Sequence, residues 1–134
     1  MRKKFEFLPH TADFKIRVYG KNLNSLINNA LSALKAFWQP KLTKKKRKIE
    51  INLEDKDLPS LIINFLSEIL SQTYIKKTIF LKFKGKILEE RKIKGIVLGY
   101  EFKELKKDIK AITYHQANLF FDNGLYTFEF IIDI

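Results

Sequence analysis

The amino-acid sequence predicts an α+β domain in which two helices pack as one layer on a largely antiparallel sheet. Two segments carry apolar residues at helical spacing, and the others read as strands in the order β-β-α-β-α followed by four strands. The last two strands flank "DNG" at residues 122–124, which is typical of a tight hairpin because Asn-Gly tolerates positive φ. At 134 residues, the chain is expected to form one domain over residues 1–134.

The composition is that of a soluble globular protein with a strongly basic balance. There are 26 Lys and Arg against 15 Asp and Glu, which gives a net charge of +11. Such a charge favours polyanionic partners such as nucleic acid, although a lysine-rich genome or a hot habitat explains it equally well. The absence of cysteine excludes disulfides and zinc-thiolate sites. With no signal-peptide pattern and no apolar run long enough to span a membrane, we expect a cytoplasmic protein without a membrane partner.

The first two strands are expected in "KKFEFL" and "DFKIRVYG", on either side of the sequence "HTAD" at residues 10–13. In the second segment, Phe14, Ile16 and Val18 alternate with polar residues, which predicts one buried face. Gly20 ends this strand. The HTAD sequence is therefore predicted to be the turn that joins the two strands.

The two helices are predicted by their start signals and their apolar repeats. The first follows Asn22 or Asn24 as N-cap and is closed by Pro40. The second follows Asp57 as N-cap with Pro59 in its first turn. Its apolar stripe consists of seven side chains, Leu58, Leu61, Ile62, Phe65, Leu66, Ile69 and Leu70.

The remaining segments predict strands that turn near residues 89–91 and 122–124. The isolated glycines Gly85, Gly95 and Gly99 lie within these strands, where they indicate bulges or close backbone approaches rather than a nucleotide-binding loop. "KKKRK" precedes the strand that contains Ile49 and Ile51, and the run consists of Lys44, Lys45, Lys46, Arg47 and Lys48. This run is a candidate RNA contact through counterion release, or a strand edge protected by solvated lysines.

Two acidic residues at opposite ends of the chain form the main candidate site. Asp13 lies near the first strand and Asp133 is the penultimate residue, so they meet if the first and last strands are neighbours. Two carboxylates with main-chain oxygens suit calcium or magnesium. The alternative is that Asp13 caps the turn and Asp133 is solvated.

The two histidines and Lys110 are weaker candidates. His115 shares its predicted strand face with Ala111 and Leu119, so a hydrogen-bonded core role is expected for it. His10 is expected to hold the HTAD turn. Lys110 points to the opposite face, into a polar site or into water. No motif supplies an activated nucleophile, so a non-catalytic protein is expected.

Four stretches in order resemble the archease family. They are "FEFLPHTADFKIRVYGKNLNSLINNAL", "DLPSLIINFLSEIL", "IKAITYH" and the ending "FIIDI", and together they span residues 5–134. The resemblance implies a small α/β accessory protein that activates the GTP- and manganese-dependent tRNA-splicing RNA ligase. Such a protein promotes guanylylation of the ligase and multiple turnover without being a ligase itself. The alternative implied role is a chaperone for a tRNA cytosine methyltransferase, or a basic tRNA-binding module.

The resemblance also implies a set of site residues. The divalent-metal ligands would be Asp13, Asp133 and the main-chain oxygen of Ile134, with calcium expected and magnesium or manganese as alternatives. With the chain ending at Ile134, its α-carboxylate would be one more oxygen donor. His10 and Thr11 would support this site, and Lys110 would contact the ligase or a nucleotide phosphate. The family's polar loop before "IKA" is shorter here and lacks a histidine, so Glu101 is expected to replace its acid.

Overall fold

The computed structural model describes residues 3–10 and 13–134, and within them seven strands and two helices occur in the order that the sequence predicts. The elements run from the N-terminal hairpin to the C-terminal strand as follows: β1 (Phe5–His10), β2 (Asp13–Gly20), α1 (Leu23–Trp38), β3 (Pro40–Glu54), α2 (Leu58–Lys76), β4 (Thr78–Leu88), β5 (Lys92–Leu105), β6 (Ala111–Asp122) and β7 (Leu125–Asp133).

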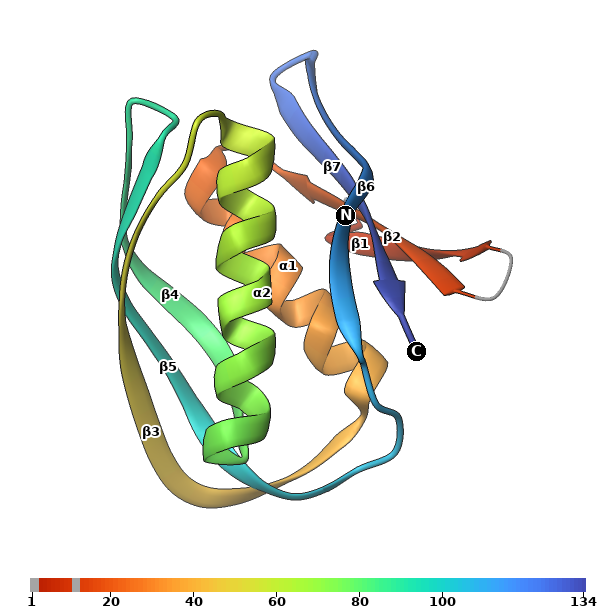
Figure 1. Cartoon of the computed structure of the whole chain (residues 1–134), viewed down its shortest axis with the longest axis vertical. Helices are drawn as coiled ribbons and strands as arrows, with labels where there is room; N and C mark the ends of the chain where they lie inside the picture. Colours follow the sequence, from red (N-terminus) through yellow and green to blue (C-terminus); the bar gives the residue numbers. More distant parts are fainter. Residues whose placement is uncertain (1–2, 11–12) are drawn as a thin grey trace.

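The strands form two antiparallel sheets, which we name sheet A and sheet B (Figure 1). Sheet A has the order β1-β2-β7-β6, so the last strand in sequence lies in its interior. Sheet B has the order β3-β5-β4. The fold class is as predicted, and the division of the strands into two sheets is a feature that alternation alone does not predict.

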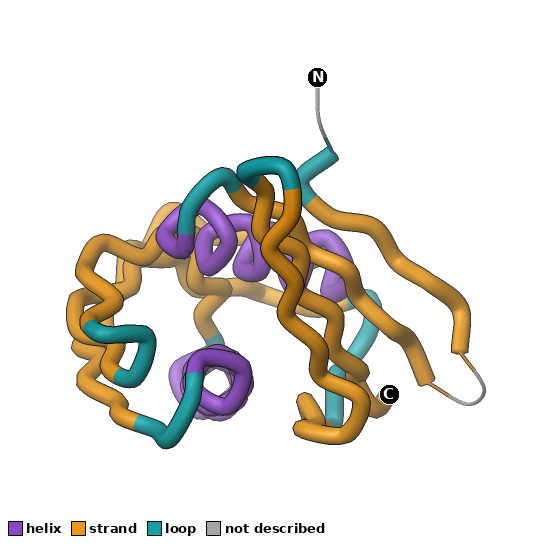
Figure 2. Tube along the Cα trace, turned by 90° about the horizontal axis from the view of Figure 1, so that it is seen from above, coloured by secondary structure: helices purple, strands orange, loops and turns teal. Residues whose placement is uncertain are grey.

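Both helices lie between the sheets and bury their apolar faces there. Figure 2 shows α2 nearly end-on, with strands on either side of it. The predicted stripe of α2 is buried, and Phe65 stacks edge-to-face on Phe83 of β4 with ring centroids 5.7 Å apart. Ile16 and Val18 of β2 are fully buried, as their alternation predicts. No described helix is long and apolar enough to cross a membrane.

The helix starts are those that the sequence indicates. Asn22 Oδ1 accepts a hydrogen bond from Ser25 N, and Asp57 Oδ1 accepts one from Ser60 N, each at 2.8 Å. The same bond to the Ser60 backbone lowers the pKa of Asp57, because it stabilises the carboxylate. Of the two proposed caps for α1, Asn22 is the correct one.

Asparagine side chains of α1 also satisfy the free edge of β4. Asn28 Oδ1 accepts from Phe83 N at 2.8 Å, and its Nδ2 donates to Phe83 O at 3.3 Å. Asn24 Nδ2 donates to Gly85 O at 3.1 Å. On the other side of the helix, Asn29 Nδ2 donates to Tyr19 O of β2 at 2.7 Å. Helix α1 therefore connects the two sheets through hydrogen bonds as well as through its apolar face.

One predicted location is wrong. His115 is exposed, whereas its position on an apolar strand face predicted a core residue. The cause is an irregularity in β6: Thr113 pairs with Ile131 and Asn118 pairs with Glu129, so β6 advances five residues while β7 advances two. Gln116 takes a positive φ of 59° within this bulge. The inserted residues break the two-residue period on which the prediction rested.

The glycines of sheet B mark close backbone approaches, as predicted. Gly85 and Gly95 are directly paired across β4 and β5. A Cβ atom added to Gly95 would collide with the carbonyl oxygen of Lys84 and with Gly85 Cα. The turn between the two strands contains Glu89 and Glu90, both with positive φ, at the position that the sequence predicts.

Candidate functional site

The two acidic residues at the ends of the chain lie at the same end of sheet A. Strand β2 starts at Asp13, strand β7 ends at Asp133, and the two strands are antiparallel with Phe14 paired to Ile132. Continuing this register by one residue sets Asp13 across from Asp133. Asp133 is exposed, and it pairs on its other side with Ala111 of β6. The register therefore brings together the two acidic residues that the sequence analysis selected.

The main chain fixes the end of β7 to the segment before β6. Lys110 N donates to Asp133 O at 2.7 Å. The Lys110 side chain is exposed beside this bond, while its neighbour Ile109 is 3% exposed and anchors the segment. Ile134 follows with 43% of its surface exposed. Lys110, Asp133 and Ile134 are thus close together in the fold.

The two residues expected to support this site are described only in part. His10 is the register partner of Asp13 in the β1–β2 hairpin. Thr11 lies outside the described residues.

Glu101 and the basic run lie on sheet B, apart from the acidic pair. Arg47 Nε donates to Glu101 Oε2 at 2.5 Å, and Lys45 Nζ is 3.6 Å from the same oxygen. The hydrogen bond from Arg47 lowers the pKa of Glu101. Glu101 therefore interacts with two members of the basic run, and the fold does not bring it to Asp133.

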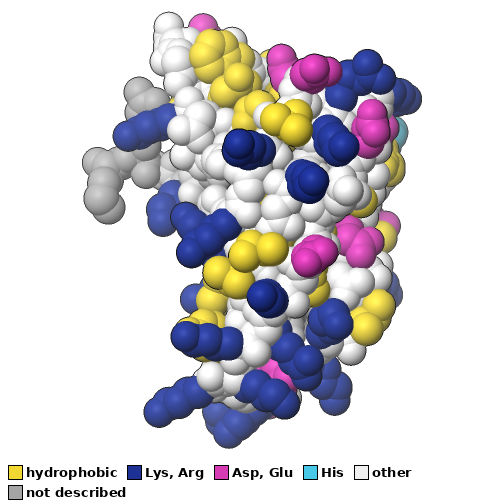
Figure 3. Space-filling view, turned by 90° about the vertical axis from the view of Figure 1, so that its left-hand side faces the viewer, with side chains coloured by type: hydrophobic (Ala, Val, Ile, Leu, Met, Phe, Trp, Pro, Cys, Tyr) yellow, Lys and Arg dark blue, Asp and Glu magenta, His cyan; other side chains and the backbone are white. Residues whose placement is uncertain are grey.

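The basic run itself belongs to β3, which begins earlier than the sequence suggested. All five residues at 44–48 are exposed on this edge strand. Figure 3 shows the side of the molecule formed by sheet B, where Lys and Arg side chains surround a few hydrophobic ones. Either interpretation of the run, as an RNA contact or as a protected edge, agrees with this exposure.

A divalent cation at the acidic pair would rely on oxygen donors. The described part of the chain contains no group of three or more His, Cys, Asp or Glu that could hold a metal. The carboxylates of Asp13 and Asp133 and a main-chain oxygen of Ile134 are oxygen donors, the type that calcium, magnesium and manganese prefer. Three such donors would leave the remaining positions of a hard cation to solvent or to a partner.

An ion-pair network that the sequence analysis missed crosses the outer face of sheet A. Arg17 Nε donates to Glu129 Oε2 at 2.6 Å, and Arg17 Nη1 donates to Glu6 Oε1 at 2.9 Å. The Tyr19 hydroxyl donates to Glu6 Oε1 at 2.7 Å. Hydrogen bonds from Tyr19, Lys3 and Arg17 lower the pKa of Glu6 to about 2, in that order of importance. The alternation of polar residues in β2 indicates that Arg17 lies on the outer face of the sheet. Its two acidic partners, however, are set by the register of β1 and β7 on either side.

Comparisons with known proteins agree with this fold. The Archease protein family (MTH1598/TM1083) model matches residues 5–134. Protein archease of Sulfurisphaera tokodaii is 30% identical over 138 residues, covering 98% of this chain and 99% of that protein. Protein archease of Pyrococcus furiosus is 34% identical over 126 residues, covering 87% of this chain and 88% of that protein.

Two solved structures share the fold. The solution structure of Methanobacterium thermoautotrophicum protein 1598 is 29% identical with a TM-score of 0.73, and the match covers 98% of this chain and 99% of that one. A Thermotoga maritima archease, described as a possible chaperone, is 17% identical with a TM-score of 0.71, covering 100% of this chain and 98% of that one. The second likeness concerns the fold alone.

Proposed function

Because the chain belongs to the archease family, we propose that it is a non-catalytic accessory protein of the tRNA-splicing RNA ligase. In this proposal it promotes guanylylation of the GTP- and manganese-dependent ligase and so permits multiple turnover. It would do so by transient contact near the ligase active site.

The observation that carries the proposal is the register of β2 and β7. Phe14 pairs with Ile132, so Asp13 and Asp133 flank one end of sheet A although they are separated by most of the chain. The pairing rests on a buried strand, because Ile132 and Phe130 are fully buried. A rigid scaffold beneath two carboxylates supports a binding site better than a frayed terminus does.

A divalent cation held by Asp13, Asp133 and a main-chain oxygen of Ile134 would add positive charge to this surface. That charge would attract phosphate or carboxylate groups of the partner. Lys110 is exposed and its main-chain N–H bonds the Asp133 carbonyl, so its ammonium group would act on the same groups as a second cation. The protein would thus orient groups of its partner rather than carry out the reaction itself.

The test is ligation of RNA ends by the ligase from the same organism. One RNA carries a 2′,3′-cyclic phosphate and the other a 5′-hydroxyl, and the protein is present at less than one molecule per ligase. We expect product well beyond one turnover per ligase with the protein and about one without it. No stimulation of a competent ligase would contradict the proposal.

Matched variants locate the effect on the protein. We expect Asp133→Asn to weaken cation binding in calorimetric titration with Ca²⁺, Mg²⁺ or Mn²⁺ and to reduce stimulation at least tenfold. Asp122→Asn removes one exposed acid at the far end of the same sheet and should change neither. If Asp133→Asn loses cation binding but still stimulates the ligase, the metal is not required for activation.

A second candidate is a chaperone for a tRNA cytosine methyltransferase. Large aromatic side chains exposed on β6 favour it, since Tyr114 is 56% exposed and Phe120 is 53% exposed. Suppression of methyltransferase aggregation by this protein, lost in Phe120→Ser, would favour this function over the first.

A further inference from the structure

We propose that two adjoining hollows beside the start of α1 bind a segment of single-stranded nucleic acid. One hollow would hold an unpaired base against aromatic rings, and the other would hold the phosphates that follow it. This inference does not rest on the ligase proposal, because the acidic pair contributes no residue to either hollow.

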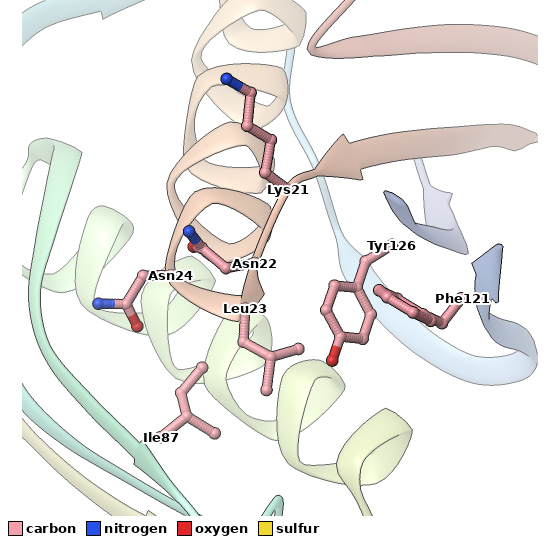
Figure 4. Close-up of a pocket in the computed structure, with 7 residues that line it drawn as sticks. All are labelled: Lys21, Asn22, Leu23, Asn24, Ile87, Phe121 and Tyr126. Carbon is pink, nitrogen blue, oxygen red and sulfur yellow. The ribbon is translucent and has the colours of Figure 1, made fainter. Parts of the chain in front are cut away.

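The first hollow lies between α1 and the β6–β7 hairpin and has a volume of about 530 Å³ (Figure 4). Phe121 and Tyr126 have ring centroids 4.6 Å apart, and Phe121 is 61% exposed. In Figure 4 the side chains of Leu23 and Ile87 point toward the space in front of Tyr126. An exposed ring beside an apolar floor is the kind of surface on which a free base face stacks.

The second hollow adjoins the first and has a volume of about 1060 Å³. Lys21, Asn22 and Asn24 line both hollows, so a bound strand could pass from one to the other. Figure 4 shows the Lys21 side chain directed away from the aromatic pair, along α1. Its exposed ammonium group is therefore available to the second hollow.

The lining of the second hollow is basic and amide-rich. It carries five lysines, Lys3, Lys4, Lys21, Lys82 and Lys84, and neither hollow is lined by a described Asp or Glu. All five are exposed. Lys3 pairs with Glu6 at 3.1 Å, whereas the other four form no ion pair within the described part of the chain. Such a cluster is complementary to a phosphodiester backbone.

The wall of this hollow is fixed before any ligand arrives. Asn28 bonds both main-chain groups of Phe83, and Asn24 bonds the carbonyl of Gly85, so the face of α1 is tied to the edge of β4. Lys82 and Lys84 lie on this same edge segment. The lysines are therefore held at a set position relative to the aromatic pair, which lowers the entropic cost of binding.

The combination of rings and lysines favours a single strand over a duplex or an acidic peptide. In a duplex the base faces are already stacked, so Phe121 would have no partner. A carboxylate peptide would engage the lysines but would make no use of the exposed ring. Single-stranded RNA and single-stranded DNA share the chemistry that this site recognises.

The test is fluorescence anisotropy with a labelled ten-nucleotide RNA of mixed sequence, the same sequence as DNA, and each as a duplex. We expect both single strands to bind at least five-fold more tightly than the duplexes at 100 mM salt. Tighter binding of RNA would assign the site to RNA, and equal binding would assign it to single strands of either sugar. Binding no tighter to single strands than to duplexes would overturn the proposal.

Matched variants distinguish the site from general electrostatic attraction. Phe121→Ala should weaken single-strand binding roughly tenfold. Phe120→Ala changes an exposed neighbour outside the hollow and should weaken it less than two-fold.

Lys82→Gln with Lys84→Gln should reduce the salt slope, the dependence of log affinity on log salt concentration, by about 1.4, at about 0.7 per phosphate contact. Lys103→Gln with Lys106→Gln makes the same change of charge at exposed positions outside both hollows and outside the basic run, and should leave the slope unchanged. Equal effects of the two lysine pairs, or no effect of Phe121→Ala, would reject the site. Thermal melting confirms that each variant is folded.

Discussion

Arg17 and Glu129 are register partners on β2 and β7, and the Arg17 guanidinium bonds the Glu129 carboxylate at 2.6 Å across the pair. The same guanidinium reaches Glu6 on β1 at 2.9 Å, so one cation joins three strands of sheet A. Glu129 is only 9% exposed, and its bond to Arg17 compensates for its removal from water. These three strands include the two that carry the acidic pair.

The lowered pKa of Glu6 predicts acid sensitivity. Its pKa falls from 4.5 to about 2 on folding, chiefly through the Tyr19 hydrogen bond. Between these values the unfolded chain binds more protons, so the free energy of unfolding decreases as the pH drops from about 4.5 to about 2. We expect the loss of Tm between pH 5 and pH 2.5 to be smaller in Glu6→Gln than in the unchanged protein. Glu50→Gln, an exposed acid on β3, serves as control, and an equal loss of Tm in all three proteins would contradict the prediction.

The two bonds between Asn28 and Phe83 predict a marked loss of stability in Asn28→Ala. Both main-chain groups of Phe83 lose their partner at a part-buried site, which costs about 1–3 kcal/mol. The measurement is the free energy of unfolding in urea. Asn24→Ala removes one exposed bond and is expected to cost about 0.5 kcal/mol. A loss in Asn28→Ala no larger than in Asn24→Ala would show that the β4 edge does not depend on this side chain.

The β4–β5 turn predicts a stabilising substitution. Glu90 has a φ of 57°, which disfavours any residue with a Cβ atom other than Asn or Asp. Glu90→Gly is expected to raise the free energy of unfolding by about 1 kcal/mol. Glu90→Gln removes the same charge but keeps the Cβ atom, so it should be close to neutral. Equal gains in the two variants would assign the effect to charge instead of backbone strain.

The paired glycines predict an opposite effect in the same hairpin. In Gly95→Ala the new methyl group meets main-chain atoms of β4 that cannot move without separating the strands. We expect a loss of about 2–3 kcal/mol in urea unfolding. At Gly124 no atom lies within 4 Å of an added Cβ, and Asn tolerates its φ of 73°, so Gly124→Asn should cost less than about 0.5 kcal/mol. An unchanged free energy of unfolding in Gly95→Ala would contradict the close backbone approach of β4 and β5 at this position.

Local periodicity predicted the elements because it reports which side of each segment is buried. Ile16 and Val18 lie in the core for that reason, and so does the stripe of α2. Periodicity does not report which strands pair. It therefore could not predict the division into two sheets or the ion-pair partners of Arg17. His115 was wrongly assigned to the core. Alternation does not reveal the irregular segment in β6, which changes the face of the residues within it. The polar side of α1 carried no sign that Asn28 would satisfy a strand edge.

For the candidate site, sequence order and spacing selected the acidic pair, and the register of β2 and β7 then brought the two residues to one end of sheet A. Glu101 was selected by its place in a loop of the family pattern, but its strand belongs to sheet B. The sequence does not indicate the aromatic hollow, because Leu23, Ile87 and Tyr126 come from three separate elements. Only the packing of those elements makes them neighbours.

The interior position of β7 in sheet A has a consequence for synthesis. Strand β2 leaves the ribosome early, but its neighbour β7 follows only after two helices and four other strands, and β6 has no other neighbour in the sheet. A nascent chain that lacks β7 leaves β2 and β6 unpaired on their inner edges and has no counterpart for Asp13. The register that sets Asp13 across from Asp133 therefore cannot form until β7 has been synthesised.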